Sequence, residues 1–376
     1  MRNILIVGAG FAGATYARLA AEDGLNVTVI DRRNHLAGNA HDHIDANGVR
    51  VHTYGPHLFH TSNSKVFEWL TGFEEFVPYE HRVRARLPDE RLAPLPINLD
   101  TLELVFDKTF ATSSEAEMFL KDISLEIETP RNAEEYLFSR IGVELTNLFF
   151  RPYTAKMWEM DLSEVAPSVV ARIPLRFDRQ NLYFPNDKYQ GLPRNGYTKL
   201  FEGMLQHDNI NVQLSRAFDK AMEAEFDFCF LSNAIDEYFD EAFGPLPYRS
   251  IKFRHEDRMR EPSVDAATIN YTDHSPYTRE THWWLLPNQQ ERPRETTTVT
   301  VEQPCSYVDN AFERYYPVKT QDGRFDAVYE KYRTEAEKNP KVSFIGRCGT
   351  YQYLNMDQVI NQSFQGYEHW KRRALA

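Results

Sequence analysis

The sequence predicts an α/β protein in which one domain is assembled from distant parts of the chain. Residues 3–31 contain a short Ile/Val/Leu strand, a glycine-rich turn, an Ala-rich helix and a second strand that ends at Asp31. Near the C-terminus, FIGRCGT (344–350) again places glycines directly after an apolar strand. A strand–helix–strand unit of this length is typical of α/β folds. The second glycine-ended strand, far along the chain, indicates that the domain is discontinuous.

The composition is that of an ordinary globular protein with two or three domains. Its 376 residues are 42% apolar and 13% aromatic, which suffices for a large core. The formal net charge is −12. We therefore expect no nucleic-acid partner, because phosphate backbones bind basic surfaces. Any anionic ligand must be held by a few local arginines.

Cysteine usage and hydropathy indicate a cytoplasmic protein. Cys229, Cys305 and Cys348 are far apart in apolar or strand-like surroundings, so we expect neither a disulfide framework nor a zinc site. The N-terminal apolar run is short and is followed at once by glycines, and no run of 18 apolar residues occurs. We therefore expect no secretion signal and no membrane span.

The first glycine turn has the spacing of a dinucleotide-binding site. Gly8, Gly10 and Gly13 form a G-x-G-x-x-G pattern between strand and helix. Such glycines permit a tight turn, close approach of a pyrophosphate and close helix–strand packing, while N–H groups at the helix start bind phosphate. Asp31 stands where an acid binds the ribose hydroxyls. A turn without a ligand is the alternative, and the strand, helix and acid together argue against it. The same site is expected to include Phe11 and Arg32.

Two further turns favour FAD over NAD. Gly38 and Asn39 closely follow the acid-bearing strand, where a nicotinamide dehydrogenase usually continues into another crossover helix. A second backbone turn at this place can meet the far end of an elongated FAD. Gly346, Arg347 and Gly349 form the third turn. Two distant segments that flank one cofactor predict a discontinuous Rossmann-like FAD-binding domain.

Ten stretches along nearly the whole chain resemble one family, the flavin-dependent UDP-galactopyranose mutases, which interconvert the pyranose and furanose forms of a nucleotide sugar. They occur in the family's order: RRNHLAGNAH (32–41), YGPHLFHTSN (54–63), LPINLDT (95–101), PYTAKMW (152–158), ARIPLRF (171–177), DKYQGLPRNGYTKLF (187–201), IDEYF with LPYRS (235–250), NYTDHSPYTRET (270–281), RYYPV (314–318) and GRCGTYQYLNMD (346–357). The resemblance is specific for the family but not for the sugar or the base.

The resemblance implies three structural parts. They are an FAD-binding domain (1–78, 195–240 and 330–376), a small helical domain (100–165), and a twisted antiparallel β-sheet (79–99, 166–194 and 241–329) with a mobile lid loop at about 172–193. The sequence agrees where it can be read. Residues 114–150 have helical apolar spacing, and ETTTVTVEQP (295–304) alternates like a strand.

The implied reaction moves the ring oxygen of the sugar without net redox, so the anomeric bond must break and the ring must open. In this family, N5 of reduced flavin attacks C1 and expels the nucleotide diphosphate, and the flavin–sugar iminium opens the ring before O4 recloses it. The resemblance therefore implies an isomerase that is active with reduced FAD. Its substrate would be UDP-galactose or a related nucleotide-diphosphate sugar, its product would enter cell-surface polysaccharides, and a homodimer is among the assemblies allowed.

Arginines and tyrosines of the matching stretches are expected to hold the substrate. A leaving diphosphate calls for arginine, whose donors match phosphate oxygens, and the family positions are Arg176, in the lid loop, and Arg279. A lone arginine is otherwise more often a solvated surface charge. The remaining positions implied are tyrosines for the diphosphate (Tyr189, Tyr315, Tyr353), a wall that stacks on the base (Phe149, Tyr153), two residues of the channel (Asn98, Trp158) and further substrate-binding residues (Thr154, Asn270, Glu302, Asn355). Glu302 matches an acid near the flavin edge, and a carboxylate on the sheet surface is the alternative. Without the resemblance, Phe149 and Trp158 would be interpreted as core.

His57 and His60 flank the Gly-Pro turn of GPHLFHT. Two histidines three residues apart could begin a metal site, but no third ligand with suitable spacing stands out, and we expect no metal. Contact with the isoalloxazine is the preferred interpretation, so both join Arg176 and Arg279 as expected catalytic residues. The cofactor is also expected to meet Tyr353, Asn355 and Met356.

The stretch YQYLNMD (351–357) differs from the usual sequence of the family at two positions. Gln352 replaces an arginine and Asn355 replaces an aspartate. Losing a negative charge near the sugar predicts a substrate other than UDP-galactose, such as a deoxy, amino or acylated sugar or one on another nucleotide. The alternative is a helix cap, at which Asn and Asp serve about equally well.

Two other functional classes stay open from the sequence. An FAD oxidoreductase of the amine-oxidase type shares the glycine fingerprint and the discontinuous cofactor domain, but it would consume oxygen with its product. A non-catalytic module that binds nucleotide sugars would keep Tyr153 and the arginines, yet it would have no use for three flavin turns.

Overall fold

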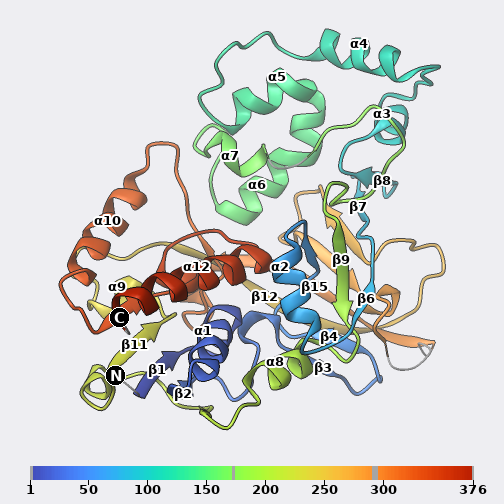
Figure 1. The fold of residues 1–376 in the computed structure, drawn as a ribbon. Helices are drawn as coiled ribbons and strands as arrows, with labels where there is room; N and C mark the ends of the chain where they lie inside the picture. Colours follow the sequence, from blue (N-terminus) through green and yellow to red (C-terminus); the bar gives the residue numbers. More distant parts are fainter. Residues whose placement is uncertain (1–2, 172–173, 290–294, 375–376) are drawn as a thin grey trace.

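The sheet that carries the first glycine turn draws its strands from three distant segments of the chain (Figure 1). The computed structural model describes residues 3–171, 174–289 and 295–374, so parts of the expected lid loop (172–173) and of the expected antiparallel sheet (290–294) lie outside it. All pairings in this sheet are parallel, in the order β10–β2–β1–β11–β17. Its strands are β1 (Asn3–Val7), β2 (Asn26–Ile30), β10 (Ile210–Gln213), β11 (Phe228–Leu231) and β17 (Val342–Phe344).

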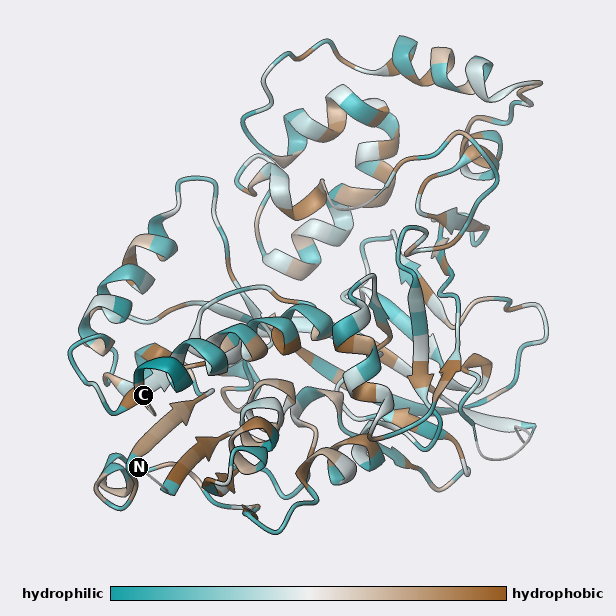
Figure 2. Ribbon diagram, in the orientation of Figure 1, coloured by the Kyte–Doolittle hydropathy of each residue, from teal (hydrophilic) through white to brown (hydrophobic). Residues whose placement is uncertain are grey.

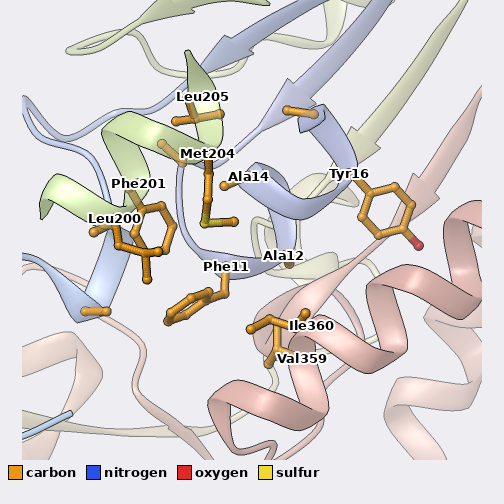
Figure 3. Packing of buried hydrophobic residues seen from close by; sticks show 14 of the residues in the cluster. Phe11, Ala12, Ala14, Tyr16, Leu200, Phe201, Met204, Leu205, Val359 and Ile360 are labelled. Atoms are coloured by element: carbon orange, nitrogen blue, oxygen red, sulfur yellow. The ribbon is translucent and has the colours of Figure 1, made fainter. Parts of the chain in front are cut away.

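Three helices cover one face of the parallel sheet. The middle helix is α1 (Phe11–Glu22), which packs against α8 (Tyr197–Leu205) and α12 (Met356–Ala374). Figure 3 shows the α1 side chains between Phe201 of α8 and Ile360 of α12. The apolar strands β1, β2 and β11 contrast with the more hydrophilic α12 in Figure 2, as expected for strands buried on both faces. Within the described residues, no helix is long and apolar enough to cross a bilayer.

A seven-stranded, mostly antiparallel sheet stands beside the parallel one, in the order β16–β12–β15–β14–β13–β7–β8. Only β13 and β7 pair in parallel within it. Its strands are β7 (Val83–Arg86), β8 (Leu92–Leu95), β12 (Tyr248–Met259), β13 (Thr268–Tyr271), β14 (Arg279–His282), β15 (Thr296–Ser306) and β16 (Tyr316–Pro317). The longest strands of this sheet are β12 and β15, which cross the middle of the molecule in Figure 1.

A separate helical part lies at the top of Figure 1 and has its own apolar core. Its helices are α3 (Leu99–Phe106), α4 (Ser113–Ile123), α5 (Ala133–Leu145), α6 (Arg151–Trp158) and α7 (Pro167–Val170). Side-chain oxygens of Asn98, Thr112 and Asn132 cap the N-termini of α3, α4 and α5, as these residue types commonly do. The expected limits of the three domains stay a prediction.

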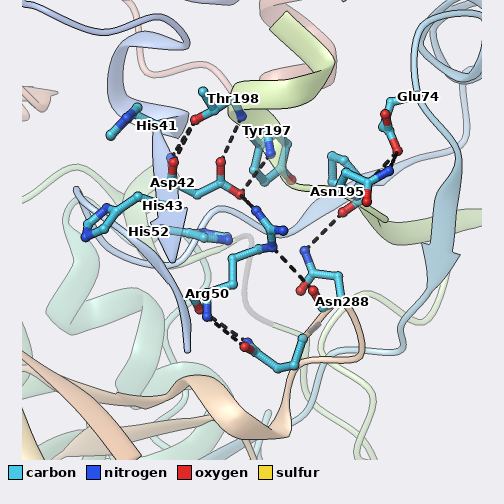
Figure 4. Close-up of polar contacts among 12 residues, drawn as sticks. His41, Asp42, His43, Arg50, His52, Glu74, Asn195, Tyr197, Thr198 and Asn288 are labelled. Carbon is cyan, nitrogen blue, oxygen red and sulfur yellow. Dashed lines mark hydrogen bonds and ion pairs between the residues drawn. The ribbon is translucent and has the colours of Figure 1, made fainter. Parts of the chain in front are cut away.

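A buried ion pair within one small sheet connects that sheet to α8 (Figure 4). This sheet consists of β3 (Asp42–Ile44) and β4 (Arg50–His52), and a second small sheet places β9 (Tyr189–Pro193) between β5 (Phe59–Thr61) and β6 (Phe76–Pro78). Asp42 lies 3.4 Å from Arg50, and both side chains are at most 5% exposed. The Asp42 carboxylate also accepts the backbone N–H groups of Tyr197 and Thr198 at the start of α8. Asp42 therefore neutralises Arg50 and caps a helix at the same time.

Candidate active site

A cavity of about 560 Å³ opens at the carboxyl ends of the parallel strands, between the three glycine turns. This is where open α/β sheets bind their ligands, and the volume is in the range of ligand pockets. Twelve residues predicted to bind cofactor line it: Gly8, Gly10, Phe11, Gly13, Asp31, Arg32, Gly38, Asn39, His57, Gly346, Arg347 and Met356.

Glycines permit close packing within the first turn and between the first and second turns. A Cβ on Gly13 would lie 1.8 Å from the carbonyl oxygen of Gly8, so no other residue fits between helix and turn. Gly38 has a φ of 54°, and a Cβ there would lie 3.0 Å from Cα of Gly10. Asp31 adds a polar link, because its carboxylate accepts the N–H groups of Ala9 (2.8 Å) and Arg33 (2.9 Å). The acid therefore ties the first turn to the segment that leads into the second.

Several donors and acceptors at the cavity have no partner within the described part of the chain. They are Nε of Arg33, Arg314 and Arg347 and Oδ1 of Asn233. Buried polar groups of native proteins are nearly always paired with protein, water or ligand. The volume, the three turns and these unpaired groups together fit an elongated dinucleotide such as FAD.

A row of polar side chains crosses the antiparallel sheet next to this cavity. Asn270 of β13 pairs in register with Arg279 of β14, which pairs with Glu302 of β15, so all three face the same side. Arg279 Nη2 donates to Glu302 Oε2 at 2.9 Å, and Glu302 is 1% exposed. Burial raises the pKa of Glu302 above its ordinary value, against the opposing charge of Arg279.

Phenol groups surround Arg279. Although burial lowers the pKa of this arginine, the charge of Glu302 and the phenols of Tyr153 and Tyr316 hold it above its usual value. Burial raises the pKa of Tyr153 to about 12 and raises that of Tyr316 as well. The site therefore presents a permanent cation among neutral O–H donors.

Arg347 connects the cavity to the cluster around Arg279, which includes Glu302, Tyr153 and Tyr316. Its guanidinium lies over the rings of Tyr316 and Tyr353, 5.3 and 5.2 Å from their centroids, and those two rings stack at 5.2 Å. His57, which also lines the cavity, donates its Nδ1–H to the Gly55 carbonyl at 2.9 Å. Burial lowers the pKa of His57 to about 3, and the charges of Arg347 and Arg279 act in the same direction. The imidazole is therefore neutral.

Three residues of this cluster were not predicted from the sequence: His81, Tyr183 and Tyr316. In RYYPV, adjacent tyrosines of a strand face opposite sides, and the motif alone does not tell which one meets Arg279. The structure places Tyr315 in the cavity wall, packed on Tyr54 and Phe253. Burial and the charge of Arg279 both lower the pKa of His81. Tyr183 lies near Tyr153.

The lid-loop arginine is engaged elsewhere. The Arg176 guanidinium donates to the carbonyl groups of Gln180 (3.0 Å) and Leu182 (2.8 Å) in its own loop. Asn98 is fully buried, caps α3 through its side-chain oxygen, and donates its amide to Gln180 at 3.4 Å. Both side chains thus brace the loop that follows residue 173, while Tyr183 of the same loop reaches the cluster around Arg279.

Residues of the helical part approach the cluster from α6. Trp158 meets Tyr316 edge to face at 6.4 Å, and Tyr153 lies beside Arg279. Thr154 is buried, and Phe149 belongs to the core of the helical part. Arg249 holds the end of α6, because its guanidinium donates to the carbonyl group of Met157 at 2.7 Å.

Three predicted residues face other neighbours. Tyr189 stacks on Phe67 of α2 (Ser64–Thr71) at 4.3 Å. His60 lies 2.6 Å from Asp187 and stacks on Phe184 at 3.5 Å, so it meets the loop before β9. Asn355 is exposed at the start of α12, where its N–H donates to Gln358 at 2.9 Å.

The described residues contain no group of three His, Cys, Asp or Glu side chains that could hold a metal ion.

The fold and the site define a dinucleotide-binding protein of the mixed α/β class, with an arginine–tyrosine cluster beside the cofactor cavity. A family model described as an NAD(P)-binding Rossmann-like domain matches residues 6–73, and one described as UDP-galactopyranose mutase matches residues 148–353. The chain belongs to the UDP-galactopyranose mutase family. The family and fold class predicted from the sequence are therefore confirmed.

Two relatives and two solved structures illustrate the match. The chain is 33% identical over 374 residues to a dTDP-fucopyranose mutase of Escherichia coli, covering 97% of each chain. It is 30% identical over 384 residues to a UDP-galactopyranose mutase of Mycoplasma pneumoniae, covering 96% and 94%. A crystal structure of reduced UDP-galactopyranose mutase has a TM-score of 0.71 at 17% identity, covering 100% and 97%. A putrescine oxidase shares the fold with a TM-score of 0.54 at 14% identity, covering 99% of each chain.

Proposed function

We propose that this chain is an FAD-dependent isomerase that interconverts the pyranose and furanose forms of a nucleotide-diphosphate sugar without net redox. The observation that carries the proposal is the position of Arg347, which lines the cofactor cavity and also covers Tyr316 and Tyr353. A diphosphate bound by the cluster around Arg279 would therefore lie directly beside the cofactor.

The residues divide the chemistry among them. The chemistry that reduced FAD supplies when bound is a nucleophilic ring nitrogen for the anomeric carbon. Arg279 stays charged at every physiological pH and would stabilise the diphosphate as its bond to the sugar breaks. Tyr153 and Tyr316 stay protonated, so their O–H groups can donate to phosphate oxygens. Glu302 orients Arg279 through one of its oxygens.

The substrate is proposed as a class rather than as one compound. The named relatives act on dTDP-fucopyranose and on UDP-galactopyranose at similar identity to this chain. Asn355 stands at the exposed start of α12, next to Met356 in the cavity wall. We propose that this position contributes to the choice among such sugars, and that the enzyme acts in the cytoplasm.

The deciding experiment separates this isomerase from an oxidase of the same fold. Protein loaded with FAD and reduced by dithionite is incubated anaerobically with UDP-galactose and dTDP-fucose, and pyranose and furanose forms are separated by chromatography. We expect furanose with the reduced protein only. The matched control is Arg279→Lys, which keeps the charge but lacks the fork of donors. Equal conversion by oxidised protein, or oxygen consumed in step with product, would overturn the proposal.

A further inference from the structure

A short segment crosses the rim of the cofactor cavity, and we call residues 310–314 the strap. It connects a turn at Tyr307–Asp309 to β16, and its residues Phe312, Glu313 and Arg314 line the cavity. At its first residue, Asn310 donates to Ser250 Oγ (2.9 Å) and to the Ile251 carbonyl (3.1 Å). The strap is therefore anchored to β12 where it begins.

Ion pairs hold the strap from two sides of the cavity, and the strap supplies an acid on one side and an arginine on the other. Glu313 pairs with Arg33 and, at 3.2 Å, with Arg32, which directly follow Asp31. Arg314 pairs at 3.2 Å with Glu237 of α9 (Ile235–Tyr238). All of these partners line the cavity. The strap thus bridges the end of β2 and the segment that follows β11.

Phe312 directly precedes the two ion-paired residues and has an unusual backbone conformation. Its φ is 59°, directly after Ala311 at 51°, and left-handed backbone is rare for a bulky residue. Its side chain is 52% exposed although it contributes to the cavity wall. Strained residues persist where the surroundings determine them, and they cluster at ligand clamps. An exposed aromatic ring at the rim, next to two residues that are held by ion pairs, is available to a flat ligand.

We infer that Phe312 is a cofactor-contact residue that packs against the adenosine end of FAD, and that the strap controls how fast FAD leaves. The adenosine end follows from position: Glu313 pairs with the arginines next to Asp31, and an acid at this place binds the ribose. Stacking on an aromatic ring suits a purine base and needs no specific hydrogen bond. The inference rests on the proposed function, because it requires FAD as the ligand.

The test measures FAD release, not activity. Holoprotein is diluted into buffer, and the release of FAD is followed by the recovery of its fluorescence. We expect Phe312→Ala to release FAD about tenfold faster, since stacking on one aromatic ring is worth roughly 1–3 kcal/mol. Phe312→Tyr keeps the ring and should match wild type. Glu313→Gln should also speed release and should weaken its dependence on salt.

A matched control and a second probe locate the contact. Val308→Ala removes another half-exposed apolar side chain just before the strap, and it should leave release unchanged. Binding of ADP to the apoprotein should weaken in Phe312→Ala, while binding of FMN should not, and thermal melting of the apoprotein confirms folding. Release within twofold of wild type for Phe312→Ala would overturn the inference alone. A wild-type protein that takes up no FAD would instead defeat the proposed function.

Discussion

Removing the Arg279 guanidinium has two separable effects. An Arg279→Ala variant loses a charge-assisted contact to the leaving diphosphate, and losses of this kind lower kcat by about 10²–10³-fold. It also leaves Glu302, which is 1% exposed and 2.9 Å from Arg279 in the native protein, buried without its cation. Because Glu302 can take up a proton, the cost at pH 7 is limited to roughly 4 kcal/mol, the free energy that protonates an ordinary Glu carboxyl group there. At pH 5 the same limit is about 1 kcal/mol.

Activity and stability assays distinguish the two effects. Furanose formation by reduced protein gives kcat, and urea unfolding at pH 5 and pH 7 gives the stability loss. FAD content, read from absorbance, should stay normal because Arg279 is not part of the cavity wall. Adding Glu302→Gln to Arg279→Ala should restore most of the stability and none of the activity. A near-normal rate for Arg279→Ala would refute its role at the diphosphate, and an equally unstable double variant would refute the account of Glu302.

Three further predictions concern specificity, packing and pH. Asn355→Asp should shift relative kcat/KM among nucleotide sugars, and an equal factor for every sugar would support a cap role instead. Asp42→Asn should destabilise the fold by about 3–5 kcal/mol in urea unfolding, because Arg50 is then buried without its partner; a loss below about 1 kcal/mol would contradict this. Burial lowers the pKa of His57 and His81 to about 3. Below about pH 6.5 the unfolded chain therefore binds more protons than the folded protein. The free energy of unfolding should consequently fall as the pH is lowered from about 6.5 to 3. His81→Asn should make that fall shallower in acid-unfolding curves, and an unchanged slope would contradict it.

Local spacing was enough to predict glycines that line one cavity. The glycines at positions 8, 10 and 13, with Asp31, occupy one strand–turn–helix unit, whose geometry depends on neighbouring residues. Gly346 could be added because it comes just after an apolar strand, and Gly38 because its turn follows the acid-bearing strand within eight residues. The cavity then forms where these turns meet at the carboxyl ends of the strands.

The cluster around Arg279 depends on information that is not local. Asn270, Arg279 and Glu302 meet through the register of three strands, and a shift of one residue would turn each side chain to the other face. Adjacent residues of an extended segment face opposite sides, so the register also decides whether Tyr315 or Tyr316 faces Arg279. The position of Arg176 and the contacts of His60 with Asp187 and Phe184 follow from the path of the loop before β9, which no periodic pattern describes.

Under the proposed function, the double contact of Arg347 would link the two ligand sites thermodynamically. Its guanidinium borders the cavity while its plane supports Tyr316 and Tyr353, so the cofactor and the diphosphate would each restrict the same side chain. Linkage is reciprocal: whatever factor bound FAD adds to the affinity for the nucleotide sugar, the sugar must add to the affinity for FAD. A cell rich in substrate would therefore retain its enzyme in the loaded form, and scarcity of either ligand would lower occupancy by the other.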